Sequence, residues 1–279
     1  MPFIIRPLAT DTLPIEAEVL RPDALADKTL DHLRRSPVYH GNRQRPLGEL
    51  FEADGDGSDG QLVLEGDFTR VKRVGENMVS GSITIRGDAG MHLGAEMRGG
   101  TIDVSGHAGD WVGAEMRGGL IHVRGDAGHL VGGSYRGSRS GMKGGAILVG
   151  GNSGNEVGCG MRRGLIGVGG DVGDFPGFSL IAGTIVVCGA FGVRCGAGMR
   201  RGTIVALGGP DQRPELLSSF RHDCLYRPQF LAIYLRQLRT WGLPVDDEAL
   251  GGQFQRYSGD LVALGKGEVL VWEREANGG

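Results

Sequence analysis

The sequence predicts an all-β fold in which about seven 19-residue turns of chain stack into a parallel β-helix, or solenoid, with a cap at each end. An excess of glycine and a regular repeat predict it. Glycine supplies 53 of the 279 residues, well above its usual share. The segments GAEMRGGTIDVSGHAG, GAEMRGGLIHVRGDAG and GCGMRRGLIGVGGDVG align without gaps. Collagen is excluded, because glycine does not recur at every third position and only 11 prolines are present.

The repeat is clearest along one column of isoleucines. Ile83, Ile102 and Ile121 are 19 residues apart, and a seven-residue insertion within 134–140 delays the next member to Ile147. Apolar residues recur two positions after each isoleucine, with mostly polar residues between them in the early turns, which is the alternation of a β-strand. A weaker early copy at 62–67 places the start of the solenoid near residue 61.

Each turn also carries an apolar residue followed by glycine, and we expect these glycines to form corners that need positive φ. The corner glycines are Gly75, Gly94, Gly113, Gly132, Gly158, Gly177 and Gly196. A helical repeat is excluded, because several glycines per turn would each cost about 1 kcal/mol in a helix.

Stacked strands leave two open ends, and we expect the flanking segments to cover them. Residues 1–60 form an N-terminal cap and partner-contact segment, with a short helix around 22–34. Residues 61–209 form the β-helix. Residues 210–279 form a C-terminal cap, with a helix at 228–241 and a strand at 268–273.

Charge and hydropathy predict a soluble cytoplasmic protein. The formal net charge is −3, the N-terminus lacks a basic region followed by a long apolar stretch, and no apolar run is long enough to span a membrane. We therefore expect neither nucleic acid nor membrane as a partner. The four cysteines have no zinc-site or disulfide spacing and are expected to be buried thiols.

No catalytic or metal-binding residue is predicted. The sequence shows no nucleophile with a base, no paired carboxylates and no metal-ligand spacing. His92, His107, His122 and His129 lie in adjacent turns but occupy four different columns, so they should not converge on a metal. The G-x-G strings follow the repeat instead of opening a helix after a strand, which argues against a dinucleotide site.

A basic column is the strongest functional signal. The residue after each repeat methionine is usually cationic. Val79 begins the series, and Ile181 breaks it. Stacked like charges repel, so an anion should compensate them. Two interpretations remain open: ion pairs with Glu96 and Glu115, or docking of an acidic partner surface or a polyanionic ligand such as a polyglutamate chain. The members of this basic column are Arg98, Arg117, Lys143, Arg162 and Arg200.

The insertion offers a second candidate. Residues 133–141 read GSYRGSRSG, a basic loop with one aromatic residue. Insertions in solenoids often lie on the binding face, although a tolerated surface loop is an equal alternative.

The repeat and its flanks together carry a family resemblance. They are the repeated G-x-x-M-R-G-G-x-I-x-V-x-G-D-A-G, His40-Gly41-Asn42, PLGELF at 46–51, RYSGDL at 256–261 and GKGE at 265–268. The chain resembles the C subunit of formylmethanofuran dehydrogenase and its counterpart in the bacterial formyltransferase/hydrolase complex. Its repeat is also similar to the glutamate synthase C-terminal GXGXG domain. That similarity, with the strong bias of parallel crossovers, implies a right-handed β-helix.

The resemblance implies a non-catalytic structural subunit of a hetero-oligomer. Its partners would be the A, B and D subunits, which carry the metal, hydrolytic and formyl-transfer chemistry, and this chain alone would bind no cofactor. The complex would move formyl from tetrahydromethanopterin to a methanofuran-type polyglutamate carrier, which this chain could contact, and hydrolyse it to formate. The strong preference for arginine over lysine favours the bacterial complex. The alternatives are the C subunit of an archaeal tungsten or molybdenum formylmethanofuran dehydrogenase, and a glutamate-synthase-like domain with its own activity.

Overall fold

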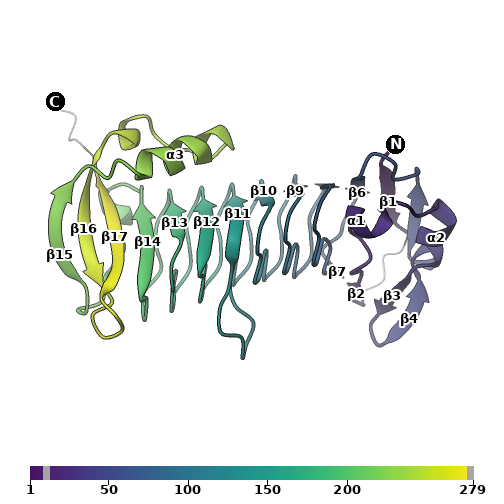
Figure 1. The fold of residues 1–279 in the computed structure, drawn as a ribbon, viewed down its shortest axis with the longest axis horizontal. Helices are drawn as coiled ribbons and strands as arrows, with labels where there is room; N and C mark the ends of the chain where they lie inside the picture. The colour runs from purple at the N-terminus through teal and green to yellow at the C-terminus, as the bar shows by residue number, and fades with distance from the viewer. Residues whose placement is uncertain (9–12, 275–279) are drawn as a thin grey trace.

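The computed structural model describes residues 1–8 and 13–274, in which strands predominate and helices are few. This agrees with the predicted all-β class. Eight strands pair in parallel, in chain order, along the long axis of the molecule (Figure 1). They are β6 (Gln61–Glu65), β8 (Ser82–Arg86), β9 (Thr101–Val104), β10 (Leu120–Val123), β11 (Lys143–Val149), β12 (Arg163–Val168), β13 (Thr184–Val187) and β14 (Arg201–Ala206).

The strand register pairs equivalent positions of successive repeats, as predicted. Ile83 pairs with Ile102, Ile102 with Ile121, and Ile121 with Ile147 across the insertion. The isoleucines point inward and are essentially inaccessible; Ile121, for example, is 0% exposed. The inward assignment of the column is therefore confirmed.

The N-terminal segment continues the sheet. Strand β1 (Phe3–Pro7) pairs in parallel with β6, and β5 (Phe51–Asp54) pairs antiparallel with β1. A smaller sheet contains β2 (Ile15–Glu16), β3 (Pro37–His40), β4 (Arg43–Pro46) and β7 (Val71–Lys72). The short helix expected around 22–34 is two short helices, α1 (Pro22–Leu25) and α2 (Leu30–Arg35), followed by the 3-10 turn η1 (Leu47–Glu49).

The C-terminal segment covers the other end of the stack. Strand β17 (Lys266–Glu273) pairs in parallel with β14, and β16 (Gln253–Gly259) and β15 (Arg221–Tyr226) follow antiparallel. The strand expected at 268–273 and the helix expected at 228–241 are confirmed, the latter as α3 (Leu231–Thr240). The 3-10 turns η2 (Pro210–Gln212) and η3 (Glu248–Leu250) flank it.

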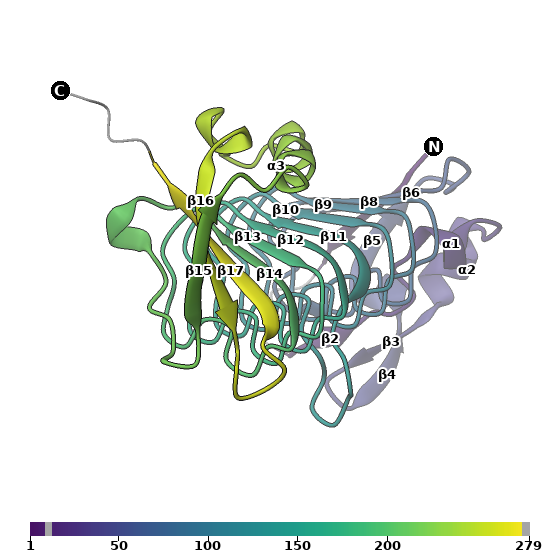
Figure 2. The ribbon, with the colours of Figure 1, turned by 60° about the vertical axis from the view of Figure 1, so that its left-hand side comes forward.

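Helix α3 covers the outer face of the later turns, as Figures 1 and 2 show. Its Leu235 and Leu238 belong to a second buried cluster with Leu148, Val186 and Val205, which point outward from β11, β13 and β14. The outward position is polar in the early turns and apolar in the later ones because the helix lies over the later ones alone. No helix among the described residues is long and apolar enough to cross a membrane.

The corners need positive φ, as predicted. Gly113 has φ +61°, and the other corner glycines lie between +60° and +71°. Non-glycine residues beside them share this conformation, such as Trp111 at φ +59° and Glu115 at φ +52°, which the glycine pattern did not indicate. The glycine between them has no side chain, which leaves room for the isoleucine of the following turns.

The prediction of four buried thiols is partly wrong. Cys159 and Cys195 are buried and Cys188 is half-buried, but Cys224 is exposed on β15, an edge strand of the sheet. Burial raises the pKa of Cys195 to about 12, so this thiol stays protonated and unreactive at neutral pH.

Candidate functional site

The basic column lies along one outer edge of the stack, where the backbone holds its members in a common register. The backbone N–H of Arg117 donates to the carbonyl of Met97, and that of Arg162 donates to Met142, each one turn earlier. The four arginines of the column are exposed, and Lys143 is half-buried. The structure therefore brings the predicted cations onto one surface.

Carboxylates compensate two of the five cations. Arg117 lies 3.7 Å from Glu96, and Lys143 lies 3.2 Å from Glu115, in both cases with the carboxylate one turn earlier. The salt-bridged interpretation therefore describes the middle of the column.

The other three cations, Arg98, Arg162 and Arg200, form no ion pair with any residue that the structure describes. The reason is in the sequence. The position that holds Glu96 and Glu115 in the two paired turns is occupied by Asn77, Gly141 and Ser179 below these arginines. Their role in binding stays a prediction.

The start of the insertion is anchored to the stack by an aromatic cluster. Tyr135 packs against Trp111 and His92, with ring centroids 6.3 Å and 5.6 Å apart, and its hydroxyl lies 2.9 Å from His92 Nδ1. The Tyr135 N–H also donates to Glu115 Oε1 at 3.3 Å. Burial raises the pKa of Tyr135 to about 12 and lowers that of His92. The loop base is therefore fixed, while residues 136–139 are exposed.

A groove of about 730 Å³ lies between this loop and the turn that joins β16 to β17. Figures 1 and 2 show the loop and the turn projecting from the same side of the stack. Arg139 and Arg200 are the charged residues among the described lining, and Val262 and Leu264 form its apolar lip. We call this the loop–hairpin groove. It joins one end of the basic column to the insertion.

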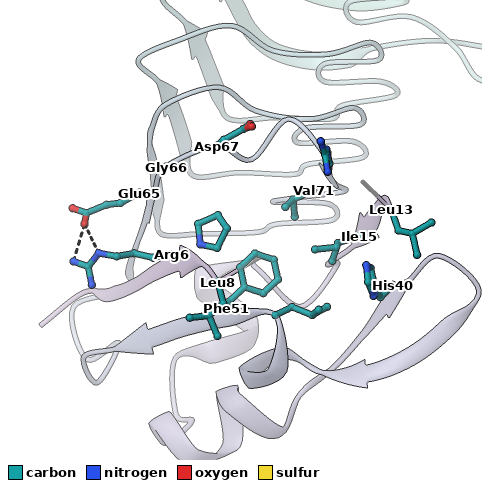
Figure 3. Close-up of a pocket in the computed structure, with 13 residues that line it drawn as sticks. Arg6, Leu8, Leu13, Ile15, His40, Phe51, Glu65, Gly66, Asp67 and Val71 are labelled. Atoms are coloured by element: carbon teal, nitrogen blue, oxygen red, sulfur yellow. Dashed lines mark hydrogen bonds and ion pairs between the residues drawn. The ribbon is translucent and has the colours of Figure 1, made fainter. Parts of the chain in front are cut away.

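A second pocket, of about 400 Å³, lies in the N-terminal part (Figure 3). Two of its charged residues are paired with each other: Arg6 Nε donates to Glu65 at 2.9 Å, and Arg86 donates to the same carboxylate at 2.6 Å. The hydrogen bond from Arg6 lowers the pKa of Glu65. Asp67 accepts from the N–H and hydroxyl of Thr69. These contacts give Arg6, Glu65 and Asp67 structural roles.

Ladders of side-chain acceptors run between turns, and sequence reasoning missed them. Asp88 accepts the N–H of His107 at 2.7 Å, and His107 Nδ1 accepts the N–H of Asp126 at 3.0 Å. Asp126 continues the series to Asn152. A parallel ladder starts at Asp110 and includes His129, Asn155 and Asp174. The recurring motifs G-[DHN]-x-G in the first ladder and G-[DHN]-x-x-G in the second were the available signals.

The ladders give a structural role to two of the four histidines that lie in adjacent turns. His107 and His129 each use Nδ1 to accept a backbone N–H from the next turn. No group of three or more His, Cys, Asp or Glu side chains within residues 1–8 and 13–274 is arranged to hold a metal ion.

The repeat has relatives among known proteins, although no family model matches the chain. The C subunit of the molybdenum-containing formylmethanofuran dehydrogenase 1 of Methanothermobacter marburgensis is 46% identical over 95 residues, 34% of this chain and 24% of that protein. The C subunit of the tungsten-containing formylmethanofuran dehydrogenase 2 of Methanothermobacter wolfeii is 40% identical over 97 residues, 33% of this chain and 36% of that protein. The matched segment thus spans about a quarter to a third of these curated relatives.

A solved structure extends the similarity to the whole chain. A chain of the formyltransferase/hydrolase complex from Methylorubrum extorquens, crystallised in complex with methylofuran, is 36% identical with a TM-score of 0.88. The match covers 97% of this chain and 100% of that one. This chain belongs to the formylmethanofuran dehydrogenase C-subunit family. The resemblance to the formylmethanofuran dehydrogenase C subunit and to the formyltransferase/hydrolase complex is confirmed. The similarity to the glutamate synthase GXGXG domain stays a prediction.

One flanking motif of this C-subunit family member shapes the loop–hairpin groove. Asp260, from the RYSGDL segment, accepts the N–H of Gly198 at 3.0 Å and that of Val262 at 2.9 Å. Burial opposes its charge, but these bonds and the Ser219 hydroxyl outweigh burial and lower its pKa. The carboxylate therefore fixes the turn between β16 and β17 against the stack.

Proposed function

We propose that this chain is a non-catalytic scaffold, the C subunit of a formyltransferase/hydrolase complex that also contains A, B and D subunits. The complex transfers formyl from tetrahydromethanopterin to a methanofuran-type carrier and hydrolyses the formyl group to formate. One observation carries the proposal: the 0.88 TM-score to a chain of such a complex over 97% of this chain.

The arrangement of the polar side chains supports a scaffold role. Glu115 is bound by Lys143 and the Tyr135 N–H, and the ladder histidines accept backbone N–H groups. Burial raises the pKa values of Cys188 and Cys195 to about 12, which makes them poor nucleophiles. These side chains therefore serve the packing and hydrogen bonding of the stack.

The fold we propose is a right-handed parallel β-helix over 61–209, with caps over 1–60 and 210–279. Its support is the in-register parallel pairing from β6 to β14, and the continuation of that sheet by β1 and β17. The hand rests on the strong bias of parallel crossovers. An experimental structure of the assembled complex tests the hand and the boundaries together.

We also propose that the basic column faces an acidic partner surface or the polyglutamate tail of the carrier. Arg98, Arg162 and Arg200 support it, because they are exposed and have no ion pair among the described residues. Such an array fits a polyanion, and we assign this chain no metal. Changing Arg98 and Arg162 together to Glu should weaken carrier retention or assembly in a salt-sensitive way. Unchanged retention and assembly would refute this role.

Two other functions compete with this proposal. The C subunit of an archaeal molybdenum or tungsten formylmethanofuran dehydrogenase is favoured by the identity of the repeat, but that match covers about a third of the chain. A glutamate-synthase-like domain would have activity of its own. The match over the full length favours the formyltransferase/hydrolase complex.

Affinity purification of the tagged chain from its native cell, followed by native mass spectrometry, tests the assignment. We expect three further subunits to copurify, formyl transfer and hydrolysis in the complex, and neither activity in the isolated chain. Bound molybdenum or tungsten in the purified complex would favour the dehydrogenase. Purification as a single active chain would refute the scaffold role.

A further inference from the structure

Three apolar side chains are unusually exposed at the turn between β16 and β17. Leu261, Val262 and Leu264 have exposed fractions of 57%, 86% and 47%. The turn is fixed by Asp260, which binds the N–H groups of Gly198 and Val262. A fixed turn that presents aliphatic side chains to water is typical of a surface that a partner covers.

The opposite wall of the loop–hairpin groove is fixed as well, and it is basic. Tyr135 anchors the base of the insertion against Trp111 and His92. Arg139 on this loop and Arg200 on the stack line the groove. Neither arginine forms an ion pair with a residue that the structure describes. The groove therefore combines unpaired cations with an uncovered apolar lip.

The floor of the groove combines an aliphatic and a cationic side chain from adjacent turns. Ile181 interrupts the basic column, and Ile181 and Arg200 both line the groove. Successive turns are about 4.8 Å apart. A segment lying along the stack would therefore meet an aliphatic side chain and a cation at adjacent turns. The complementary segment carries an aliphatic residue close to an acidic one.

We propose that the loop–hairpin groove receives an extended, acidic segment of a partner subunit, whose aliphatic side chains cover Val262 and Leu264 and whose carboxylates bind Arg139 and Arg200. The inference rests on the proposed function, because it needs a complex. A polypeptide is favoured over the polyglutamate tail of a carrier, because that tail has no apolar side chain to cover the lip. Charge complementarity and the covered aliphatic area together would give the contact its specificity.

The test uses the complex assembled from purified A, B and D subunits with variants of this chain. The groove variants are the double change Arg139→Glu with Arg200→Glu, and the single change Val262→Asp. Arg136→Glu is the control for charge, because Arg136 is exposed in the same loop but does not line the groove. Val79→Asp is the control for the apolar change, because Val79 is 54% exposed at the other end of the column. Circular dichroism melts of all variants show whether the fold is kept.

We expect each groove variant to weaken association about tenfold or more, and the controls to stay within about twofold. The effect of the arginine pair should shrink as salt is raised, whereas that of Val262→Asp should persist. Groove variants that associate as tightly as wild type would overturn the inference while leaving the proposed function intact. Loss of carrier in the arginine variant with normal assembly of Val262→Asp would also overturn it, in favour of an anionic ligand.

Photocrosslinking gives a second readout that does not depend on altered affinity. Val262→p-benzoylphenylalanine places a crosslinker on the lip of the groove at a highly exposed position. Mass spectrometry of the irradiated complex should map the crosslink to a partner segment that contains both acidic and aliphatic residues. A crosslink to a basic segment, or no crosslink in an assembled complex, would overturn the inference. If wild type itself fails to associate, the proposed function fails first.

Discussion

Replacing Gly113 by alanine should destabilise the stack through two separable effects. Gly113 has φ +61°, where a residue with a side chain costs about 1–2 kcal/mol. A Cβ at this position would lie 2.4 Å from Cδ1 of Ile147, which is 0% exposed and cannot move away freely. Overpacking of this kind costs about 1–3 kcal/mol. The expected loss is therefore about 2–5 kcal/mol of unfolding free energy.

Two further variants separate the effects. Gly137 has φ +86°, and no atom lies within 4 Å of a Cβ placed there, so Gly137→Ala should show the backbone cost alone. Ile147→Val removes the clashing methyl group and by itself costs about 0.5–1.5 kcal/mol. Because Gly113→Ala and Ile147→Val share one contact, the double variant should be about 1–3 kcal/mol more stable than the sum of the single effects.

Denaturant unfolding followed by circular dichroism measures each free energy. The reasoning is refuted if Gly113→Ala destabilises the chain no more than Gly137→Ala does, or if the two changes at Gly113 and Ile147 are additive.

Three other predictions follow from the described contacts. Ile121→Asp places a carboxylate in the centre of the core and should lower the free energy of unfolding by more than about 4 kcal/mol, seen as loss of cooperative melting. A melting temperature within a degree or two of wild type would contradict the inward position of this column. His107→Asn keeps an acceptor for the Asp126 N–H and should leave the melting temperature unchanged, whereas His107→Leu should lower the free energy of unfolding by about 1 kcal/mol. Equal melting temperatures for the two variants would show that the ladder does not stabilise the fold. Burial lowers the pKa of His92, so the unfolded chain binds more protons and the free energy of unfolding should fall as pH drops from 7 to 5. His92→Phe should make the free energy of unfolding depend less on pH, and an unchanged pH dependence would contradict this cause.

The repeat could be predicted from the sequence because each turn places the same kinds of residue at the same inner positions. Ile121 and Met116 belong to columns that recur at 19-residue intervals, and both are 0% exposed. Gly113 recurs in the same way and has the positive φ that its corner needs. The caps could be anticipated in outline, because an open sheet needs cover. Their topology could not, because the pairing of β17 with β14 joins segments far apart in the chain.

The site was predicted less completely. A column of cations is visible in one dimension, but the pairing of Arg117 with Glu96 depends on which residues lie one turn earlier on the same edge. The loop–hairpin groove brings Arg139 together with Val262, which lies far later in the chain. No local sequence pattern indicates that Arg139 and Val262 line the same groove. The exposed aliphatic turn after RYSGD was the one sequence signal that could have been noticed.

Because every parallel strand from β8 to β14 repeats the same local contacts, the distance between the two capped ends is a count of turns. Duplicating one 19-residue unit before β10 would move the N-terminal segment away by about 4.8 Å, while α3 and the C-terminal strands kept their neighbours. The length of the stack can therefore change in steps of one turn. Adding or removing a turn would change the distance between surfaces near the two ends while leaving the residues of each surface unchanged.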